Sequence, residues 1–177
     1  MTPAKFLQYC IIFVAGLACH NVFALPDDSQ QKMSIDSNTW EFDIQSGTTT
    51  FVGKVELQQG SLKINADKLV IYGKFESGRP ESAQKIVATG KPARFQQTPR
   101  KGEIPVKAVA NRLEYSVKNE TLFLIDKAHL DQDGTSLSGN RIEYDVQKAL
   151  VKAGSKKTDE DDRVRMVIPP KVLQTKE

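Results

Sequence analysis

The feature that most constrains this chain is a run of alternating apolar and polar residues that changes phase in its middle. The run is Gly60-Ser-Leu-Lys-Ile-Asn-Ala-Asp-Lys-Leu-Val-Ile-Tyr72. Leu62, Ile64 and Ala66 share one parity, whereas Leu69 and Ile71 share the other. Residues of equal parity in a β-strand point to the same face of a sheet. The apolar face therefore stays inward only if the strand bulges or turns a corner at residues 66–68.

The same unit occurs three more times along the chain. Its copies comprise Ala108, Ala110, Leu113, Tyr115 and Val117 around Asn111-Arg112; Leu137, Gly139, Ile142, Tyr144 and Val146 around Asn140-Arg141; and, more faintly, Ile35, Ser37, Trp40, Phe42 and Ile44 around Asn38-Thr39. The corners fall at positions 38, 67, 111 and 140, at intervals of 29, 44 and 29 residues. A strand-corner-strand unit that repeats at such intervals predicts a sheet wound into stacked layers, with free strand edges at both ends.

Between these units the chain also reads as β-strand from about Met33 to Ile168. Thr49, Phe51, Val55 and Leu57 share a parity around Gly53, and Leu122, Leu124, Ala128 and Leu130 do so around Asp126. Pro92 indicates an edge or bulged position in the strand between them. No long window keeps apolar residues at helical spacing after the first 24 residues, so we expect a single all-β domain over residues 33–170.

The N-terminus has the pattern of a cleaved signal peptide covering residues 1–24. Lys5 supplies a basic start, the apolar run from Phe6 to Ala18 follows, and Val22-Phe23-Ala24 fits a cleavage site. An uncleaved anchor and lipidation at Cys19 are the alternatives. We expect residues 25–32 to be a flexible lead-in and residues 171–177 a flexible tail.

After cleavage the chain contains few residues of the types that act in catalysis. Both cysteines, Cys10 and Cys19, leave with the signal, and His129 becomes the only histidine. Nucleophilic triads need a histidine base and zinc sites need several His or Cys ligands, so we expect no catalytic residue, no metal and no cofactor. Aspartate pairs at 131/133 and 36/43 remain as carboxylate alternatives, although turn chemistry explains the first. Removing Lys5 lowers the net charge from +3 to +2, which gives no reason to expect nucleic acid as a partner.

The remaining functional feature is the inward apolar face. Its predicted members are Phe51, Leu62, Ile64, Leu69, Ile71, Phe95, Leu113, Tyr115, Leu124, Leu137 and Tyr144. They form either a fully packed core or, if the two layers stand slightly apart, a space for an apolar ligand.

Three blocks of sequence resemble a known family. Phe51-Val-Gly-Lys-Val-Glu-Leu-Gln-Gln-Gly-Ser-Leu-Lys-Ile-Asn-Ala-Asp-Lys-Leu-Val70, Gly90-Lys-Pro-Ala-Arg-Phe95 and Gly139-Asn-Arg-Ile-Glu-Tyr144 are similar to the periplasmic lipopolysaccharide-transport bridge proteins of the organic-solvent-tolerance-like family. The first block is specific, whereas the later two also occur in sister proteins of that pathway. The resemblance covers roughly residues 33–170.

The resemblance implies a twisted β-jellyroll of many short antiparallel strands, open at both ends, whose interior takes the acyl chains of lipopolysaccharide. It implies a periplasmic carrier that passes this lipid from a membrane-anchored inner-membrane component to an outer-membrane translocon. Lys54, Lys68, Arg112 and Arg141 are candidate head-group contacts. Edge strands near Ile35 and Val167 are candidates for head-to-tail self-association.

Two other function classes remain open. A structural or adhesive β-solenoid would have a fully packed interior and bind nothing. A secreted polysaccharide-active β-helix enzyme would need a catalytic constellation that this sequence does not display.

Overall fold

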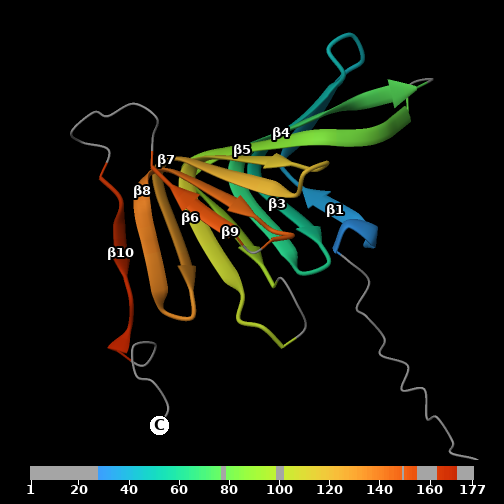
Figure 1. The fold of residues 1–177 in the computed structure, drawn as a ribbon. Helices are drawn as coiled ribbons and strands as arrows, with labels where there is room; N and C mark the ends of the chain where they lie inside the picture. Colours follow the sequence, from blue (N-terminus) through green and yellow to red (C-terminus); the bar gives the residue numbers. More distant parts are fainter. Residues whose placement is uncertain (1–27, 77–78, 99–101, 149, 155–162, 171–177) are drawn as a thin grey trace, which may run out of the picture.

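The fold is known from a computed structural model that describes residues 28–76, 79–98, 102–148, 150–154 and 163–170 (Figure 1). The expected signal peptide at 1–24 and the expected tail at 171–177 lie outside these residues. Among the described residues no helix is long and apolar enough to cross a membrane.

The described chain is one antiparallel sheet preceded by a short 3-10 helix. The elements are η1 (Asp28–Gln30), β1 (Met33–Asp36), β2 (Thr39–Asp43), β3 (Thr48–Gln59), β4 (Leu62–Glu76), β5 (Arg79–Gln97), β6 (Val106–Ser116), β7 (Thr121–Gln132), β8 (Thr135–Asp145), β9 (Leu150–Ala153) and β10 (Arg165–Val167). The strand order is β1-β3-β4-β5-β6-β7-β8-β10, while β2 pairs with β3 and β9 pairs with β8. From β3 to β8 sequential strands are neighbours, as expected when short turns connect them.

Three of the four predicted corners coincide with β-bulges between continuous strands, whereas the corner at Asn38 separates β1 from β2. The pairing of β4 with β5 shifts between Asn65 and Lys68, and the pairing of β6 with β7 shifts between Val109 and Arg112. The pairing of β7 with β8 shifts between Ile125 and Ala128, opposite the predicted corner at Asn140. Because a bulge keeps the hydrogen-bonded ladder on both sides, β3 to β8 are long bent strands rather than separate short ones.

Left-handed backbone conformations build the bulges of β3 and β7. Gly53 and Lys54 have φ values of 85° and 48°, and Asp126 and Lys127 have φ values of 63° and 53°. Glycine adopts this region without steric cost, which explains its place in β3. The β5 bulge lies between Thr89 and Ala93 and contains Pro92, so this proline sits at a bulge in the middle of the sheet.

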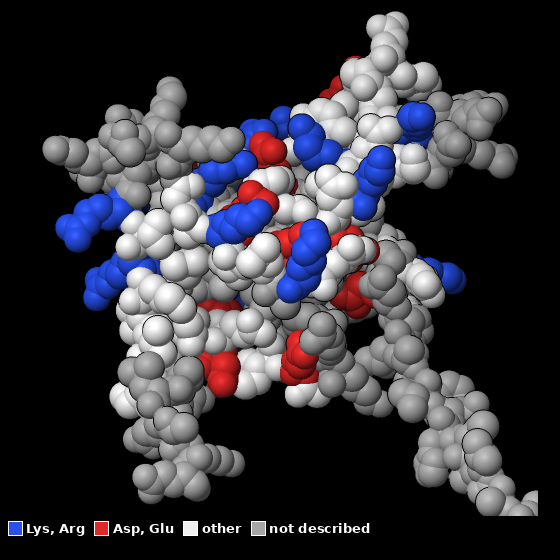
Figure 2. Space-filling view, viewed as in Figure 1, with Lys and Arg blue, Asp and Glu red and all other residues white. Residues whose placement is uncertain are grey.

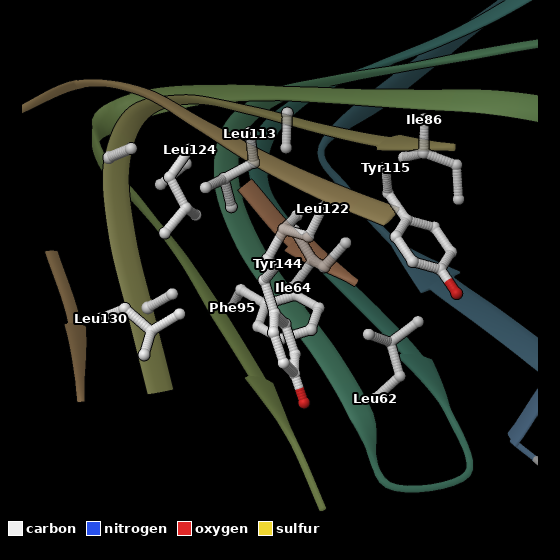
Figure 3. Packing of buried hydrophobic residues seen from close by; sticks show 14 of the residues in the cluster. Leu62, Ile64, Ile86, Phe95, Leu113, Tyr115, Leu122, Leu124, Leu130 and Tyr144 are labelled. Atoms are coloured by element: carbon white, nitrogen blue, oxygen red, sulfur yellow. The ribbon is translucent and has the colours of Figure 1, made fainter. Parts of the chain in front are cut away.

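The aligned bulges form a bulge column that bends the sheet into two layers. Layer A contains β1, β10 and residues 55–59, 62–66, 93–97, 106–110, 128–132 and 135–139; layer B contains β2, β9 and residues 48–52, 68–76, 79–89, 112–116, 121–125 and 141–145. The inner faces of both layers pack into a single apolar cluster (Figure 3). The all-β, twisted jellyroll architecture with open ends is therefore confirmed.

Residues 28–30, which lie within the expected lead-in, form η1 and are attached to the sheet. The Asp28 carboxylate accepts hydrogen bonds from the Ser61 backbone N–H at 2.7 Å and from the Ser61 hydroxyl at 2.6 Å. It also accepts one from the Gln97 amide at 2.9 Å. One carboxylate therefore fastens the chain to the β3–β4 turn and to the end of β5.

Candidate functional site

The inner face of layer B is a set of apolar rows that cross every strand. Directly paired residues in antiparallel strands share a face, so the register defines each row. The row nearest the bulge column is Trp40, Phe51, Leu69, Ala88, Leu113, Leu124, Ile142 and Ala153. The next is Phe42, Thr49, Ile71, Ile86, Tyr115, Leu122, Tyr144 and Val151. These rows run from one free edge of the sheet to the other.

Layer A carries a matching row on its inner face. It consists of Ile35, Leu57, Ile64, Phe95, Ala108, Leu130, Leu137 and Met166. Figure 3 shows side chains from both layers pointing into the space between them, with Ile64, Phe95 and Tyr144 among those close to one another. The two inner faces therefore enclose one continuous apolar space.

Packing within this space is tight in the middle of the sheet. Of the eleven predicted interior residues, eight are buried, namely Leu62, Ile64, Leu69, Phe95, Leu113, Tyr115, Leu124 and Tyr144. Phe51, Ile71 and Leu137 are partly buried and pack against this cluster. Leu69, Leu122 and Ile142 are each 0% exposed, so side chains fill the centre.

An open cavity of about 600 Å³ lies at the end of the space near β9 and β10. Its apolar lining consists of Ile104, Leu130, Leu137, Val151 and Met166, which come from both layers and from the β5–β6 connection. Gly102, Glu103, Gln132, Asp133, Thr135 and Ser136 complete the wall. Apolar cavities with a few polar groups at their rim are typical of small-molecule sites.

The apolar rows also reach the surface at both free edges. Trp40 on β2 is 68% exposed and Met166 on β10 is 58% exposed, although both occupy inner-face positions. Neither β2 nor β10 has a strand beyond it within the described sheet. The ends of the interior are thus open sheet edges with large apolar side chains.

Sequence reasoning missed several residues of this site. Leu57, Ile86, Leu122 and Ile142 are buried in the core, and Ile104, Leu130, Val151 and Met166 line the cavity. These residues were absent from the predicted interior set, although the alternation around Gly53 and Asp126 already gave the parity of Leu57, Leu122 and Leu130, and the unit around Asn140-Arg141 gave that of Ile142. No short-range pattern marks Ile104, because it lies in a connection rather than a strand.

The four candidate head-group residues lie away from the cavity. Lys68, Arg112 and Arg141 occupy one outer-face row beside the bulge column, with Thr89 and Ile125 between them, and Lys54 lies in the β3 bulge. The Arg112 guanidinium is paired with Glu114 at 2.6 Å, and that of Arg141 stacks 4.8 Å from the centre of the Phe123 ring. Figure 2 shows Lys and Arg side chains spread over one face with Asp and Glu between them.

Perturbed carboxylates lie in turns. Two hydrogen bonds from Ser46, from its hydroxyl and its backbone N–H, and one from the Gln45 backbone N–H lower the pKa of Asp43. A hydrogen bond from the Lys148 ammonium lowers the pKa of Asp145 in the same way. These shifts reflect turn formation at the surface rather than chemistry in the interior.

His129 and the aspartates do not assemble a reactive centre in the described ranges. His129 is half-buried on the outer face, and its Nδ1 lies 2.9 Å from the Ser138 hydroxyl. No group of three or more His, Cys, Asp or Glu side chains in this part of the chain is arranged to hold a metal ion. The arrangement that remains is an apolar space between two layers.

Comparison with known proteins agrees with this geometry. Residues 34–149 match the family model described as LptA/(LptD N-terminal domain) LPS transport protein. The chain belongs to this LptA family. The resemblance inferred from the sequence blocks is thereby confirmed.

Members of the LptA family are similar to this chain over most of its length. The lipopolysaccharide export system protein LptA of Haemophilus influenzae is 37% identical over 96% of this chain and 96% of its own length. LptA of Escherichia coli strain K12 is 34% identical over 87% of this chain and 80% of its own length. The crystal structure of LptH from Pseudomonas aeruginosa, described as the LptA-homologous periplasmic component of the lipopolysaccharide transport device, matches with a TM-score of 0.73. That match has 29% identity and covers 82% of this chain and 100% of LptH.

Proposed function

We propose that this protein is a periplasmic carrier that binds lipopolysaccharide through its acyl chains and passes it between membranes without chemistry. The observation that carries the proposal is the apolar interior, whose rows run from edge to edge and open into a cavity of about 600 Å³. Membership in the LptA family supports the same assignment.

Burying an acyl chain in an apolar interior yields a large gain in free energy. Each methylene group removed from water is worth about 0.8 kcal/mol. An acyl chain of about a dozen carbons therefore gains on the order of 9 kcal/mol when it is buried. Apolar contact is non-directional, so a smooth row of Leu, Ile and Phe side chains holds a chain without fixing its position along the row. A carrier needs this combination of burial and freedom to slide.

Ligand uptake starts at the cavity in this proposal, because the centre is already filled. Leu137, Val151 and Met166 offer apolar surface there, whereas Leu69 and Leu124 touch only protein. Chains that advance further separate the layers and replace contacts between side chains with contacts to lipid. Phosphorylated head groups stay outside, and Lys54, Lys68, Arg112 and Arg141 remain the proposed contacts for heads on the bulge side.

The free edges extend the proposal to assembly. β1 and β2 at one edge, and β9 and β10 at the other, leave backbone groups unpaired on their outer sides within the described sheet. Edge strands of this kind accept a strand from another protein. We assign them to head-to-tail self-association through the regions of Ile35 and Val167, and to the sister domains of the inner-membrane component and the outer-membrane translocon.

Site-specific photo-crosslinking in cells tests the carrier function. A photoreactive residue replaces the inward-facing Leu69, Tyr144 or Leu137, and the outward-facing Lys63 or Glu143 serves as the matched control. We expect lipopolysaccharide adducts from the inward set, strongest at Leu137 beside the cavity. Equal labelling of the two sets, or none, would instead favour a structural β-solenoid, the alternative suggested by the filled centre.

A further inference from the structure

We propose that the rim of layer A farthest from the bulge column binds the sugar and phosphate groups of the lipid, with Asp28 as an internal competitor for half of that site. The inference rests on the proposed function, because it takes the ligand to have acyl chains and a polar head. It adds the residues that hold the head and the segment that the head displaces.

A polar row ends the inner face of layer A. It lies two residues beyond the apolar row of Leu57, Phe95 and Leu130, at the ends of the strands farthest from the bulge column. The amide and hydroxyl groups of this rim row belong to Gln59, Gln97, Gln132 and Thr135, and Met33, Leu62 and Val106 lie among them. An amphiphile with its chains between the layers therefore places its head beside these amides.

Residues 28–31 cover the rim row from β3 to β5. The Asp28 carboxylate accepts a hydrogen bond from the Gln97 amide at 2.9 Å. The Gln31 backbone carbonyl accepts one from the Gln59 amide at 3.0 Å. Because β3 and β5 flank β4, the segment crosses the end of β4, close to the β3–β4 turn where Figure 3 shows Leu62.

The same rim row is open at β7 and β8. Gln132 and Thr135 are partly buried and lie in the wall of the cavity of about 600 Å³. Apolar side chains of Leu130 and Leu137 stand beside them in that wall. This half of the rim combines polar groups with apolar surface, and the covered half would offer the same combination without residues 28–31.

The Asp28 carboxylate occupies an anion site formed by the Ser61 backbone N–H, the Ser61 hydroxyl and the Gln97 amide. The Ser61 hydroxyl also accepts a hydrogen bond from the Thr98 backbone N–H at 3.1 Å, which keeps it in place without Asp28. Gly60 permits the close approach, because a Cβ there would overlap a carboxylate oxygen of Asp28. Phosphate oxygens accept the same charge-assisted hydrogen bonds as a carboxylate.

Gln97 indicates that the true ligand also carries hydroxyl groups. Its side chain is 6% exposed, and its Oε1 has no hydrogen-bond partner within the described ranges. Asp28 cannot satisfy this oxygen, since an ionised carboxylate only accepts hydrogen bonds. A buried acceptor without a donor is unfavourable. A head with both a phosphate and a sugar hydroxyl therefore satisfies Gln97 more completely than Asp28 does.

Removing the competitor tests the site. Asp28→Ala should bind fluorescent lipopolysaccharide roughly fivefold more tightly, because affinity falls with the fraction of protein whose site is occupied internally. Asp36→Ala is the matched control, since it removes the same charge from the outer face of β1. An equal gain in both variants would assign the effect to net charge and overturn the proposal. Unchanged or weaker binding by Asp28→Ala would show that Asp28 only fastens the chain.

Replacing the rim amides tests the ligand chemistry. Asp28→Ala combined with Gln97→Leu should bind lipopolysaccharide no more tightly than the wild type. Gln132→Leu alone should lower affinity by roughly threefold, as expected for one lost hydrogen bond. Diphenylhexatriene, a fluorescent hydrocarbon without hydroxyl or phosphate groups, is the comparison ligand and should bind Gln132→Leu as well as before. Equal losses for both ligands would show that the leucine disturbs the apolar space instead of a head-group site.

Hydrogen exchange followed by NMR tests the displacement itself. The Gln31 backbone N–H donates to the Asp28 carbonyl at 3.0 Å, whereas the Ser61 N–H donates to the carboxylate. Saturating lipopolysaccharide should accelerate exchange at Gln31 and leave Ser61 protected, because the head replaces the carboxylate as acceptor. Unchanged exchange at Gln31, or lost protection at Ser61, would contradict the proposal.

Two further comparisons identify the source of the anion and separate the proposals. Inorganic phosphate at millimolar concentration should leave exchange at Gln31 unchanged, since it has no acyl chains to hold it at the rim. Acceleration by phosphate alone would assign the site to a free anion and overturn the lipid-head assignment. Failure of the wild type to bind either lipopolysaccharide or diphenylhexatriene refutes the carrier function, whereas binding of both without a gain from Asp28→Ala refutes only the rim site.

Discussion

Two leucines on the inner face should respond differently to the same truncation. Leu69 is 0% exposed in the filled centre, so Leu69→Ala leaves a cavity between the layers. Truncations of this kind cost about 2.7–5.0 kcal/mol of unfolding free energy. Leu137 borders a cavity of about 600 Å³ and is partly buried. Leu137→Ala enlarges space that already exists, so at about 0.8 kcal/mol per lost methylene and partial burial we expect only about 1–1.5 kcal/mol.

Thermal unfolding followed by circular dichroism separates these values. At about 2–4 °C per kcal/mol for a domain of this size, Leu69→Ala should lower Tm by roughly 5–20 °C, whereas Leu137→Ala should lower it by about 2–6 °C. Urea titration provides an independent free energy, and an unchanged m-value shows that the comparison is valid.

Lipid binding should show the opposite order. A fluorescent lipopolysaccharide displacement assay should record a loss of roughly fivefold for Leu137→Ala, corresponding to about 1 kcal/mol of lost contact. Leu69→Ala should change affinity less, provided it is measured well below its Tm. Equal destabilisation by the two variants, together with unchanged lipid affinity for Leu137→Ala, would refute an interior that is filled in the centre and open at one end.

Three further predictions concern the bulges, the N-terminal fastening and a turn. Gly53→Ala should lower stability by at least about 1–2 kcal/mol in urea unfolding, because φ is 85° and the new Cβ would lie 2.6 Å from a neighbouring amide nitrogen. Gly102→Ala is the control, since φ is 83° but nothing lies within 4 Å; a loss equal to that of Gly53→Ala would show that the close contact is unimportant. Asp28→Ala should cost about 1–3 kcal/mol by removing the acceptor for Ser61, and Tm should fall accordingly; an unchanged Tm would contradict the fastening. The lowered pKa of Asp43 means that its turn is stabilised above the ordinary carboxyl pKa and loses this stabilisation as pH falls through the depressed value. Amide chemical shifts of the turn should follow that titration, and Asp43→Asn should remove it.

The bends of the sheet could be predicted because alternation records them directly. Leu62, Ile64 and Leu69 can all face inward only if the alternation is interrupted between Ile64 and Leu69, and the pairing of β4 with β5 shifts register there, between Asn65 and Lys68. The same logic located the bends near Arg112 and Arg141. The parity of the apolar residues therefore predicts the strands, the corners and most of the inner face.

The remaining features depend on contacts far apart in the sequence. Ile86, Val87 and Ala88 form an unbroken apolar run, so the sequence does not show which of them face inward. Val87 is only 4% exposed although it lies on the outer face. Trp40 has the same pattern as Phe51, yet it is exposed because β2 is an edge strand. No local sequence pattern predicts the exposure of an edge strand or the width of the gap between the layers.

The bulge column acts as a hinge between the two layers. The layers are continuous on both sides of it, and each strand is hydrogen-bonded to its neighbours in each layer. A rotation that opens the angle between the layers at one strand is therefore transmitted to the adjacent strands. The volume available to a ligand between the layers is consequently determined by the whole sheet. A ligand that separates the layers at the β9–β10 end loosens the packing around Leu124 before it contacts that residue.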